Sequence, residues 1–154
     1  MSEKKYIVFT LNGERYGVPV EQVLSIEKPE GVTPVPNTAP FVKGIMNLRG
    51  ILYPVIDMKQ RFGIGESAVQ KETRLAIVQI DDIKVAILID SAEDVISIDE
   101  ESIEPAPEVT GGVKADYIHG VAKIDDGLLV LLNLDRVLRD KDVEIVKKIE
   151  VNER

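Results

Sequence analysis

Few residues of this chain have the type and spacing that catalysis requires, and the strongest candidate is Asp90. It follows three apolar residues in the run Ile87–Ala92, Ile-Leu-Ile-Asp-Ser-Ala. Two apolar-Asp-Ser/Thr-Gly loops supply the carboxylates that share a proton in aspartic proteases. Here Ala92 replaces the glycine, and Glu21-Gln22 occupies the corresponding place in the other half of the chain. We therefore expect Asp90 to end a strand and to cap the turn that follows.

The other candidates for catalysis or metal binding lack the partners that they would need. His119 is the only histidine, is expected on the surface, and has no serine on a strained turn to complete a Ser-His-Asp arrangement. The cluster Asp99–Glu101 with Glu104 lacks the glycine and the ligand spacing of a calcium loop. Gly111-Gly112 is not followed by a phosphate-binding pattern, and the chain has no cysteine. The sequence predicts no catalytic residue, no metal site and no cofactor, and hence not an enzyme.

Composition and charge limit the partners that the protein can have. The 154 residues carry a formal net charge of −8, and 44% are hydrophobic, 30% charged and 5% aromatic. Nucleic acids and anionic lipids require a basic face, so we expect no nucleic-acid partner. No apolar run approaches the roughly 20 residues of a membrane span, and the opening Met-Ser-Glu-Lys-Lys is not a signal peptide. We expect a cytoplasmic protein without direct membrane insertion.

The one side chain that suggests a binding role is Arg49, at the predicted tip of a β-hairpin. Apolar runs at Val42–Leu48 and Ile51–Met58 flank Arg49-Gly50, which is the spacing of a tight two-residue turn. Gly44 inside the first run indicates a bulge or a close backbone approach. Pro54 inside the second run cannot donate a ladder hydrogen bond, which favours an edge strand or a bulge. A solvated turn arginine is the simplest interpretation, but rigid hairpin tips and arginines are also preferred at interfaces.

The remaining elements are mostly short strands. Asn12-Gly13 predicts a type I′ turn, Asp57 is expected to cap a helix over Met58–Phe62 that Gly63 ends, and residues 28–40, with four prolines, predict an extended connector. We expect a polar loop at Gly63–Lys71 and a charged tail at residues 140–154, where Ile145, Val146 and Ile149 have helical spacing. The other predicted elements are strands at Tyr6–Leu11, Arg15–Val20, Leu24–Glu27, Arg74–Ile80, Ile83–Ile89, Val95–Ile98, Tyr117–Ile124 and Leu128–Leu132, and a helix after Asn133 or Asp135.

An internal repeat organises these elements. A shift of 76 residues places Phe41–Phe62 on Tyr117–Leu138 without a gap, so that Gly44 meets Gly120 and Asp57 meets Asn133. A shift of 69 residues places Tyr6–Leu11 on Leu75–Ile80. Each copy of about 70 residues would be marginal by itself. We therefore predict an all-β fold of two small five-stranded barrels packed on a shared core, with short helices and a C-terminal helix. At the hairpin tip, Arg49-Gly50 of the first copy becomes Asp125-Asp126 in the second.

The order and spacing of these motifs resemble the CheW family of chemotaxis coupling proteins. The resemblance covers residues 4–139 and depends on Tyr16-Gly17, Thr33–Pro36, Phe41–Gly44 leading to Asn47–Gly50, and Pro54–Asp57. It implies two SH3-like β-barrels in a single domain over residues 1–154. We assign residues 15–72 to the first barrel, residues 4–14 and 73–139 to the second, and residues 140–154 to a charged tail.

The resemblance also implies a function and a set of binding residues. Members of the family are non-catalytic adaptors that couple the cytoplasmic tip of methyl-accepting chemoreceptors to the regulatory domain of the histidine kinase CheA, in arrays at the inner face of the membrane. The family's receptor-facing groove maps onto Val23, Arg49 and Val95. Its kinase-facing side maps onto Gly44, Ile45 and Asn47. The alternative is a stand-alone regulatory or ligand-binding β-barrel module related to the CheA regulatory domain or to the CheV proteins, serving another two-component pathway.

Overall fold

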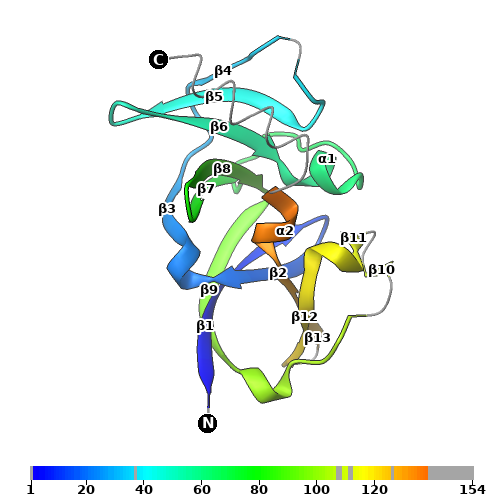
Figure 1. The fold of residues 1–154 in the computed structure, drawn as a ribbon. Helices are drawn as coiled ribbons and strands as arrows, with labels where there is room; N and C mark the ends of the chain where they lie inside the picture. Colours follow the sequence, from blue (N-terminus) through cyan, green and yellow to red (C-terminus); the bar gives the residue numbers. More distant parts are fainter. Residues whose placement is uncertain (1, 37, 107–108, 111–112, 126, 139–154) are drawn as a thin grey trace.

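The computed structural model describes residues 2–36, 38–106, 109–110, 113–125 and 127–138, without the side chains of residues 109–110 (Figure 1). Its strands form two sheets that curve into small barrels, one above the other in Figure 1. The tail at residues 140–154 and the expected turn residues Gly111, Gly112 and Asp126 lie outside the described residues. The expectation of a mostly β protein with two barrels is confirmed.

The strands of the first barrel are β3 (Val23–Glu27), β4 (Val32–Thr33), β5 (Val42–Leu48), β6 (Ile51–Asp57), β7 (Arg74–Ile80) and β8 (Ile83–Ile89). They lie in the order β3-β7-β8-β6-β5-β4. The strands of the second barrel are β1 (Glu3–Leu11), β2 (Glu14–Pro19), β9 (Ser91–Asp99), β12 (Ile118–Ile124) and β13 (Gly127–Leu132). They lie in the order β12-β13-β2-β1-β9.

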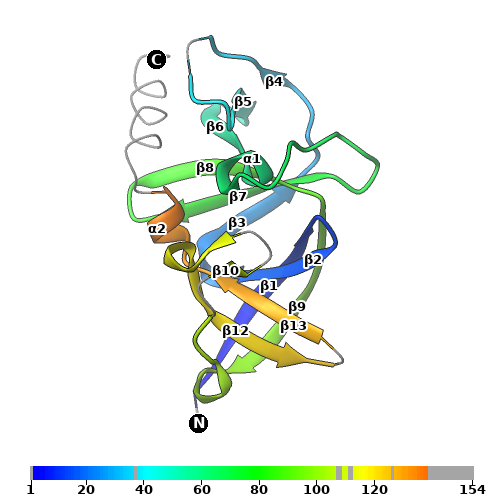
Figure 2. The ribbon, with the colours of Figure 1, turned by 90° about the vertical axis from the view of Figure 1, so that its right-hand side faces the viewer.

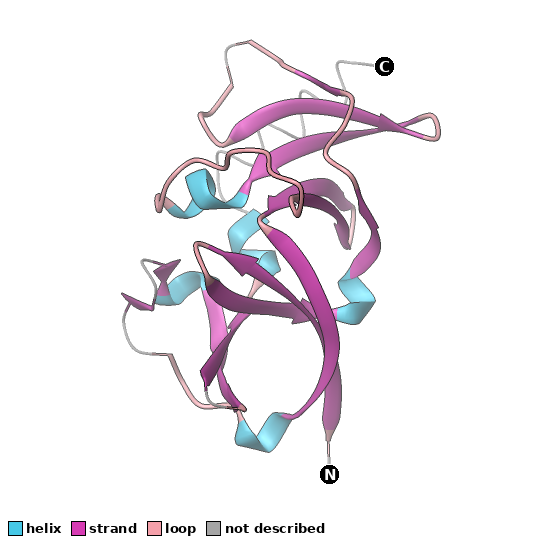
Figure 3. Ribbon diagram, turned by 180° about the vertical axis from the view of Figure 1, so that it is seen from behind, coloured by secondary structure: helices cyan, strands magenta, loops and turns pink. Residues whose placement is uncertain are grey.

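Short elements complete the fold (Figure 3). Between strands lie η1 (Val20–Gln22), α1 (Met58–Phe62), η2 (Glu100–Ser102) and η3 (Ala115–Tyr117), and α2 (Leu134–Leu138) follows β13. The strands β10 (Val109–Thr110) and β11 (Val113–Lys114) form a separate small hairpin.

The 76-residue repeat is confirmed in the arrangement of the strands. Adding 76 to the bounds of β5 and α1 gives those of β12 and α2. Both first strands carry a bulge, between Val42 and Gly44 and between Ile118 and Gly120. The second strand of each copy pairs in parallel with a strand of another hairpin in the same barrel, β6 with β8 and β13 with β2. The two copies therefore share topology as well as sequence pattern.

The barrels divide the chain differently from the boundaries that the sequence predicted. Residues 15–19 were assigned to the first barrel, but the two-residue turn Asn12-Gly13 holds β2 beside β1 in the second. The hairpin β7–β8 was assigned to the second barrel, but β8 pairs with β6 in the first. Strand β3 pairs with β7, and β9 pairs with β1. Each barrel is therefore built from strands of both repeats, with a larger exchange than the predicted boundaries implied.

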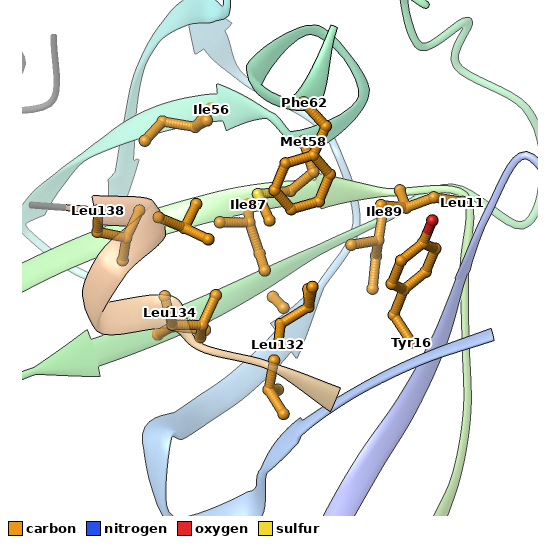
Figure 4. Packing of buried hydrophobic residues seen from close by; sticks show 14 of the residues in the cluster. Leu11, Tyr16, Ile56, Met58, Phe62, Ile87, Ile89, Leu132, Leu134 and Leu138 are labelled. Carbon is orange, nitrogen blue, oxygen red and sulfur yellow. The ribbon is translucent and has the colours of Figure 1, made fainter. Parts of the chain in front are cut away.

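Buried side chains form one central cluster and a smaller cluster on each sheet. The central cluster combines residues of both barrels and both α helices, among them Tyr16, Ile56, Ile87, Leu132 and Leu134 (Figure 4). The smaller clusters contain Met46, Tyr53 and Leu75 in the first barrel and Tyr6, Ala122 and Leu129 in the second. The shared core is therefore the contact between the barrels.

Local predictions at α1 are confirmed, whereas those for Pro54, the connector and Asp90 need correction. The Asp57 carboxylate accepts a hydrogen bond from the Lys59 N–H at 3.0 Å, and Gly63 ends α1 in the left-handed region. Strand β6 lies between β8 and β5 in the sheet, so as a whole it is not an edge strand. Its pairing with β8 begins only at Val55, however, so Pro54 lies in the half of the strand that pairs with β5 alone. The connector contains β4, which pairs with β5. Asp90 ends β8, but its carboxylate accepts a hydrogen bond from the Asn12 N–H at 2.9 Å and does not cap the next turn.

Gly44 and Gly120 each leave room for a chain segment that crosses the first strand of the hairpin. Gly44 has φ 149°, and a Cβ there would overlap the carbonyl group of Thr33 in β4. At Gly120 a Cβ would lie 2.8 Å from the Glu104 oxygen. The close approach that the sequence predicted at Gly44 is thus made within the chain, so a side chain there would disturb the fold before it reached any partner.

Replacing Gly44 by alanine should therefore destabilise the protein by about 2–3 kcal/mol, from backbone strain and displacement of β4. Gly31→Ala is the matched control, because Gly31 also has positive φ (75°) but open space where the Cβ would be. It should cost about 1 kcal/mol from strain alone. Urea unfolding measures both, and equal losses would mean that the contact with Thr33 is not restrictive.

Tyr16 offers a test of the central core. Its hydroxyl is buried without a hydrogen-bond partner in the described structure, and burial raises the pKa of Tyr16. Its ring stacks on Phe9 at 6.0 Å between centroids, a contact that phenylalanine would keep. Tyr16→Phe should raise the free energy of unfolding by about 1 kcal/mol, because an unsatisfied buried hydroxyl is removed. A clear loss of stability would show that the hydroxyl has a partner in solution.

Candidate functional site

The tip of the β5–β6 hairpin is the clearest candidate for a functional site. Arg49 and Gly50 have φ 52° and 86° and form the predicted two-residue turn. The side-chain oxygen of Asn47 accepts a hydrogen bond from the Gly50 N–H at 2.9 Å. The Arg49 side chain is 75% exposed, and its Nη2 lies 3.9 Å from Oε2 of Glu27, at the end of β3. The hairpin is therefore rigid, and its charged tip leans toward β3.

Arg49 is an unusual residue for this backbone conformation. Four described residues other than glycine have positive φ, namely Asn12, Arg49, Asp81 and Asp125. Asparagine and aspartate tolerate the left-handed region because their short polar side chains bond locally, whereas a long side chain gains nothing from it. Three of the four turns thus use a residue suited to the turn. The turn at Arg49 does not, which indicates that the arginine serves another purpose.

The strand β3, whose end Arg49 approaches, carries exposed apolar side chains. Leu24 and Ile26 are 51% and 37% exposed. Ile51, directly after the turn, is 47% exposed. The sequence analysis did not single out these residues. The alternation of Leu24 and Ile26 within an edge strand was the signal that could have identified them.

The predicted receptor-facing residues occupy both barrels. Val23 begins β3 and packs against the central core, while Glu27, the neighbour of Arg49, ends the same strand about 13 Å away. Val95 of β9 is 53% exposed and lies opposite Ile7 of β1. Both β3 and β9 are edge strands of their sheets. The structure thus joins Arg49 to the strand of Val23 and places Val95 on the equivalent edge of the other barrel.

The three predicted kinase-facing residues gather on the opposite strand of the first barrel. Ile45 and Asn47 line an open cavity of about 340 Å³, and Gly44 lies beneath its wall at Thr33. Leu52 of β6 forms part of the same surface. The cavity is further lined by Gly31, Pro34, Val35 and Pro36 of the connector. We call this surface the connector pocket. Its lining is mainly apolar and lacks ionisable groups, which suits contact with a protein.

The ionisable groups of the described residues form no catalytic arrangement. Burial raises the pKa of Tyr6 and Tyr16, and the hydrogen bond from Lys43 lowers the pKa of Glu66. His119 is exposed, as expected. Within the described ranges, no three His, Cys, Asp or Glu side chains are grouped to hold a metal ion. In the same part of the chain, no helix has the length and apolar character needed to cross a membrane.

Comparisons with known proteins agree with this fold. The model of the CheW-like domain matches residues 5–142. The chemotaxis protein CheW of Bacillus subtilis is 41% identical over 142 residues, which cover 90% of this chain and 88% of that protein. CheW of Helicobacter pylori is 32% identical, with 88% and 81% covered.

A solved structure and a longer relative also match this chain. The crystal structure of the scaffolding protein TtCheW from Thermoanaerobacter tengcongensis matches with a TM-score of 0.83 and 39% identity, covering 92% of both chains. The chemotaxis protein CheV3 of Helicobacter pylori is 26% identical, but the match covers only 49% of it. The chain thus matches CheW proteins over nearly their full length and CheV3 over half. Its family match, its two barrels and its near-complete coverage of these relatives show that the chain belongs to the CheW family.

Proposed function

We propose that this protein is a chemotaxis adaptor that binds the cytoplasmic tip of chemoreceptors and the regulatory domain of the histidine kinase CheA. The role of a chemotaxis coupling adaptor follows from membership of the CheW family. The two partners are the more specific part of the proposal. They correspond to two surfaces. The receptor surface combines the hairpin tip with the edge strands β3 and β9, and the kinase surface is the connector pocket.

The observation that carries the receptor site is the arginine in a turn that favours asparagine. The fold gains nothing from Arg49 at φ 52°, and its single ion pair, at 3.9 Å with a largely exposed guanidinium, contributes little to stability. At an interface, however, a planar guanidinium can hold a carboxylate or a carbonyl group in a fixed geometry. Leu24 and Ile26 supply exposed apolar area on the same strand as Glu27. An amphipathic receptor helix with an acidic or carbonyl group near its apolar face would fit this combination.

The connector pocket supports the kinase site. Apolar side chains from two chain segments meet there, the proline-rich connector and the face of the β5–β6 hairpin. Leu52, which is partly exposed above the buried Ile45, would provide the apolar anchor that protein interfaces use. Asn47 has a second role, because its side chain already bonds the Gly50 N–H and so links the pocket to the hairpin tip.

Arg49→Asn should separate the receptor site from the fold. Asparagine suits the left-handed turn better, so stability should stay the same or rise by up to about 1 kcal/mol. Affinity for a receptor tip fragment should fall by about thirtyfold, equivalent to about 2 kcal/mol, because an interfacial anchor is lost. Thermal unfolding and titration calorimetry measure the two effects.

Asp125→Asn is the matched control, because Asp125 occupies the equivalent turn of the second barrel with φ 46°. It should bind receptor like the parent protein. If Arg49→Asn also kept the parent affinity, the receptor site would have to lie away from the hairpin tip.

Leu52→Glu should weaken binding to the kinase regulatory domain by about tenfold or more, because it places a charge in the apolar centre of the connector pocket. Leu128→Glu provides the control, since Leu128 holds the equivalent place on β13 and is 50% exposed. Calorimetric titration of the kinase domain decides between them. Equal losses for both variants would contradict a kinase site confined to the first barrel.

A further inference from the structure

Helix α1 belongs to the first barrel but sends a charged side chain across to the second. Met58 and Phe62 point into the central core, one turn apart. Arg61 lies between them on a different face of the helix. Its Cζ is 5.2 Å from the ring centroid of Phe41 and 4.9 Å from that of Tyr117. Phe41 leads into β5 of the first barrel, and Tyr117 leads into β12 of the second.

The contacts of Arg61 follow the internal repeat. Phe41 and Tyr117 are equivalent under the 76-residue shift, so the guanidinium touches the same position of both copies. Its Nε and Nη2 donate hydrogen bonds to the Val137 carbonyl at 3.2 and 2.9 Å. Val137 is itself the residue equivalent to Arg61 in α2. One side chain therefore contacts equivalent positions of both copies.

We propose that Arg61 is a positioning residue that fixes the orientation of the two barrels, and through it the relative placement of the edge strands β3 and β9. The part that concerns β3 and β9 rests on the proposed receptor site. The geometry suits this role because a planar guanidinium offers two parallel donors along its edge and a face to each ring. An ammonium group cannot make both kinds of contact at once in fixed directions.

The apolar core alone leaves the orientation less well defined. Apolar contacts hold the barrels together but have little directional preference, whereas hydrogen bonds do. A second polar link lies on the same helix, where Lys59 Nζ is 3.1 Å from Oδ2 of Asp90. Asp90 in turn accepts from the Asn12 N–H, and Asn12 Nδ2 donates to the Ile64 carbonyl at 3.0 Å. Loss of Arg61 should therefore loosen the orientation without separating the barrels.

The position of α1 explains how this contact could reach the proposed receptor surface. In Figure 1, α1 lies on the right of the junction between the barrels and β3 on the left, and Figure 2 shows α1 and α2 from that right-hand side. A small rotation about the contact between α1 and α2 would therefore shift β3 relative to β9. The connector pocket, by contrast, is lined only by residues of the first barrel and its connector.

A distance measurement between the barrels tests the first part of the proposal. The chain has no cysteine, so Lys28→Cys and Lys123→Cys, exposed positions on the first and second barrels, can carry spin labels specifically. The parent should give one narrow distance distribution, and Arg61→Gln a broader or shifted one. Arg61→Lys, which keeps the charge and one donor, should fall between them and provides a second variant if Arg61→Gln does not fold.

Arg74→Gln is the matched control, because Arg74 donates to the Lys71 and Thr73 carbonyls of its own segment. It should leave the distribution of the parent unchanged. Distributions for both Arg61 variants that match the parent would overturn the proposal. This measurement needs no partner, so it decides the role of Arg61 even if the parent protein proves not to bind receptor, a result that would refute the proposed function alone.

Binding measurements test the second part. Arg61→Gln should weaken receptor binding by about tenfold, in the range for residues that act on a site through the fold. Binding to the kinase regulatory domain should change by less than about twofold, because the connector pocket belongs to the first barrel and its connector alone. Equal losses for both partners would instead indicate general destabilisation. A broadened distribution with parent-like receptor affinity would overturn the link between barrel orientation and the receptor surface.

Discussion

The apolar core shared by the two barrels is the constraint on which the rest of the structure depends. A unit of about 70 residues buries too little surface to be more than marginally stable by itself. The central cluster relieves this limit by taking buried side chains from both barrels and from α1 and α2. The exchange of strands makes each repeat depend further on the other. Strand β3 of the first repeat pairs with β7 of the second, and β9 of the second repeat pairs with β1 of the first. Neither repeat could close its own barrel.

The same scaffold is kept in both copies while the exposed positions differ. Gly44 and Gly120 both make room for a crossing segment. The Asp57 N–H donates a hydrogen bond to the Phe41 carbonyl, and the Asn133 N–H donates one to the equivalent Tyr117 carbonyl, both at 2.8 Å. At the hairpin tip, however, Arg49 is replaced by Asp125. Because stability depends mainly on the shared interior, the tips could change charge at little cost to the fold. A duplicated scaffold therefore yields one barrel with an arginine tip and one with an acidic tip.

Polar contacts complement the core at the junction of the barrels. Arg61, Lys59 and Asn12 connect α1 and the loop after it to segments of the second barrel. Buried apolar area supplies most of the free energy of such a junction, whereas directed hydrogen bonds select one arrangement among many of similar area. The receptor surface proposed on the edge strands β3 and β9 would require that selection, because the spacing of those strands follows from the arrangement.

The sequence by itself determined the local elements, the repeat and the family. Turns with glycine, asparagine or aspartate define the hairpins, Asp57 and Gly63 bound α1, and the gapless shift predicts equivalent bulges at Gly44 and Gly120. These features depend on residues within a few positions of each other, where backbone sterics and side-chain caps act directly. The resemblance of the Asn47–Gly50 motif and its neighbours to the CheW family identified the same scaffold that the comparisons then showed.

Only the tertiary structure decided which segments meet. The pairing of β3 with β7, the overlap of Gly44 with Thr33, and the hydrogen bonds from Arg61 to Val137 join residues that local pattern leaves unconnected. The boundaries at residues 15–72 failed for this reason, since alternation gives the faces of a strand but not its neighbours. Edge-strand pairing is chosen by the packing of the whole core, in which all buried groups must be satisfied together. The neighbours of β3, and with them the exposed Leu24 and Ile26 beside Arg49, therefore emerged only from the folded chain.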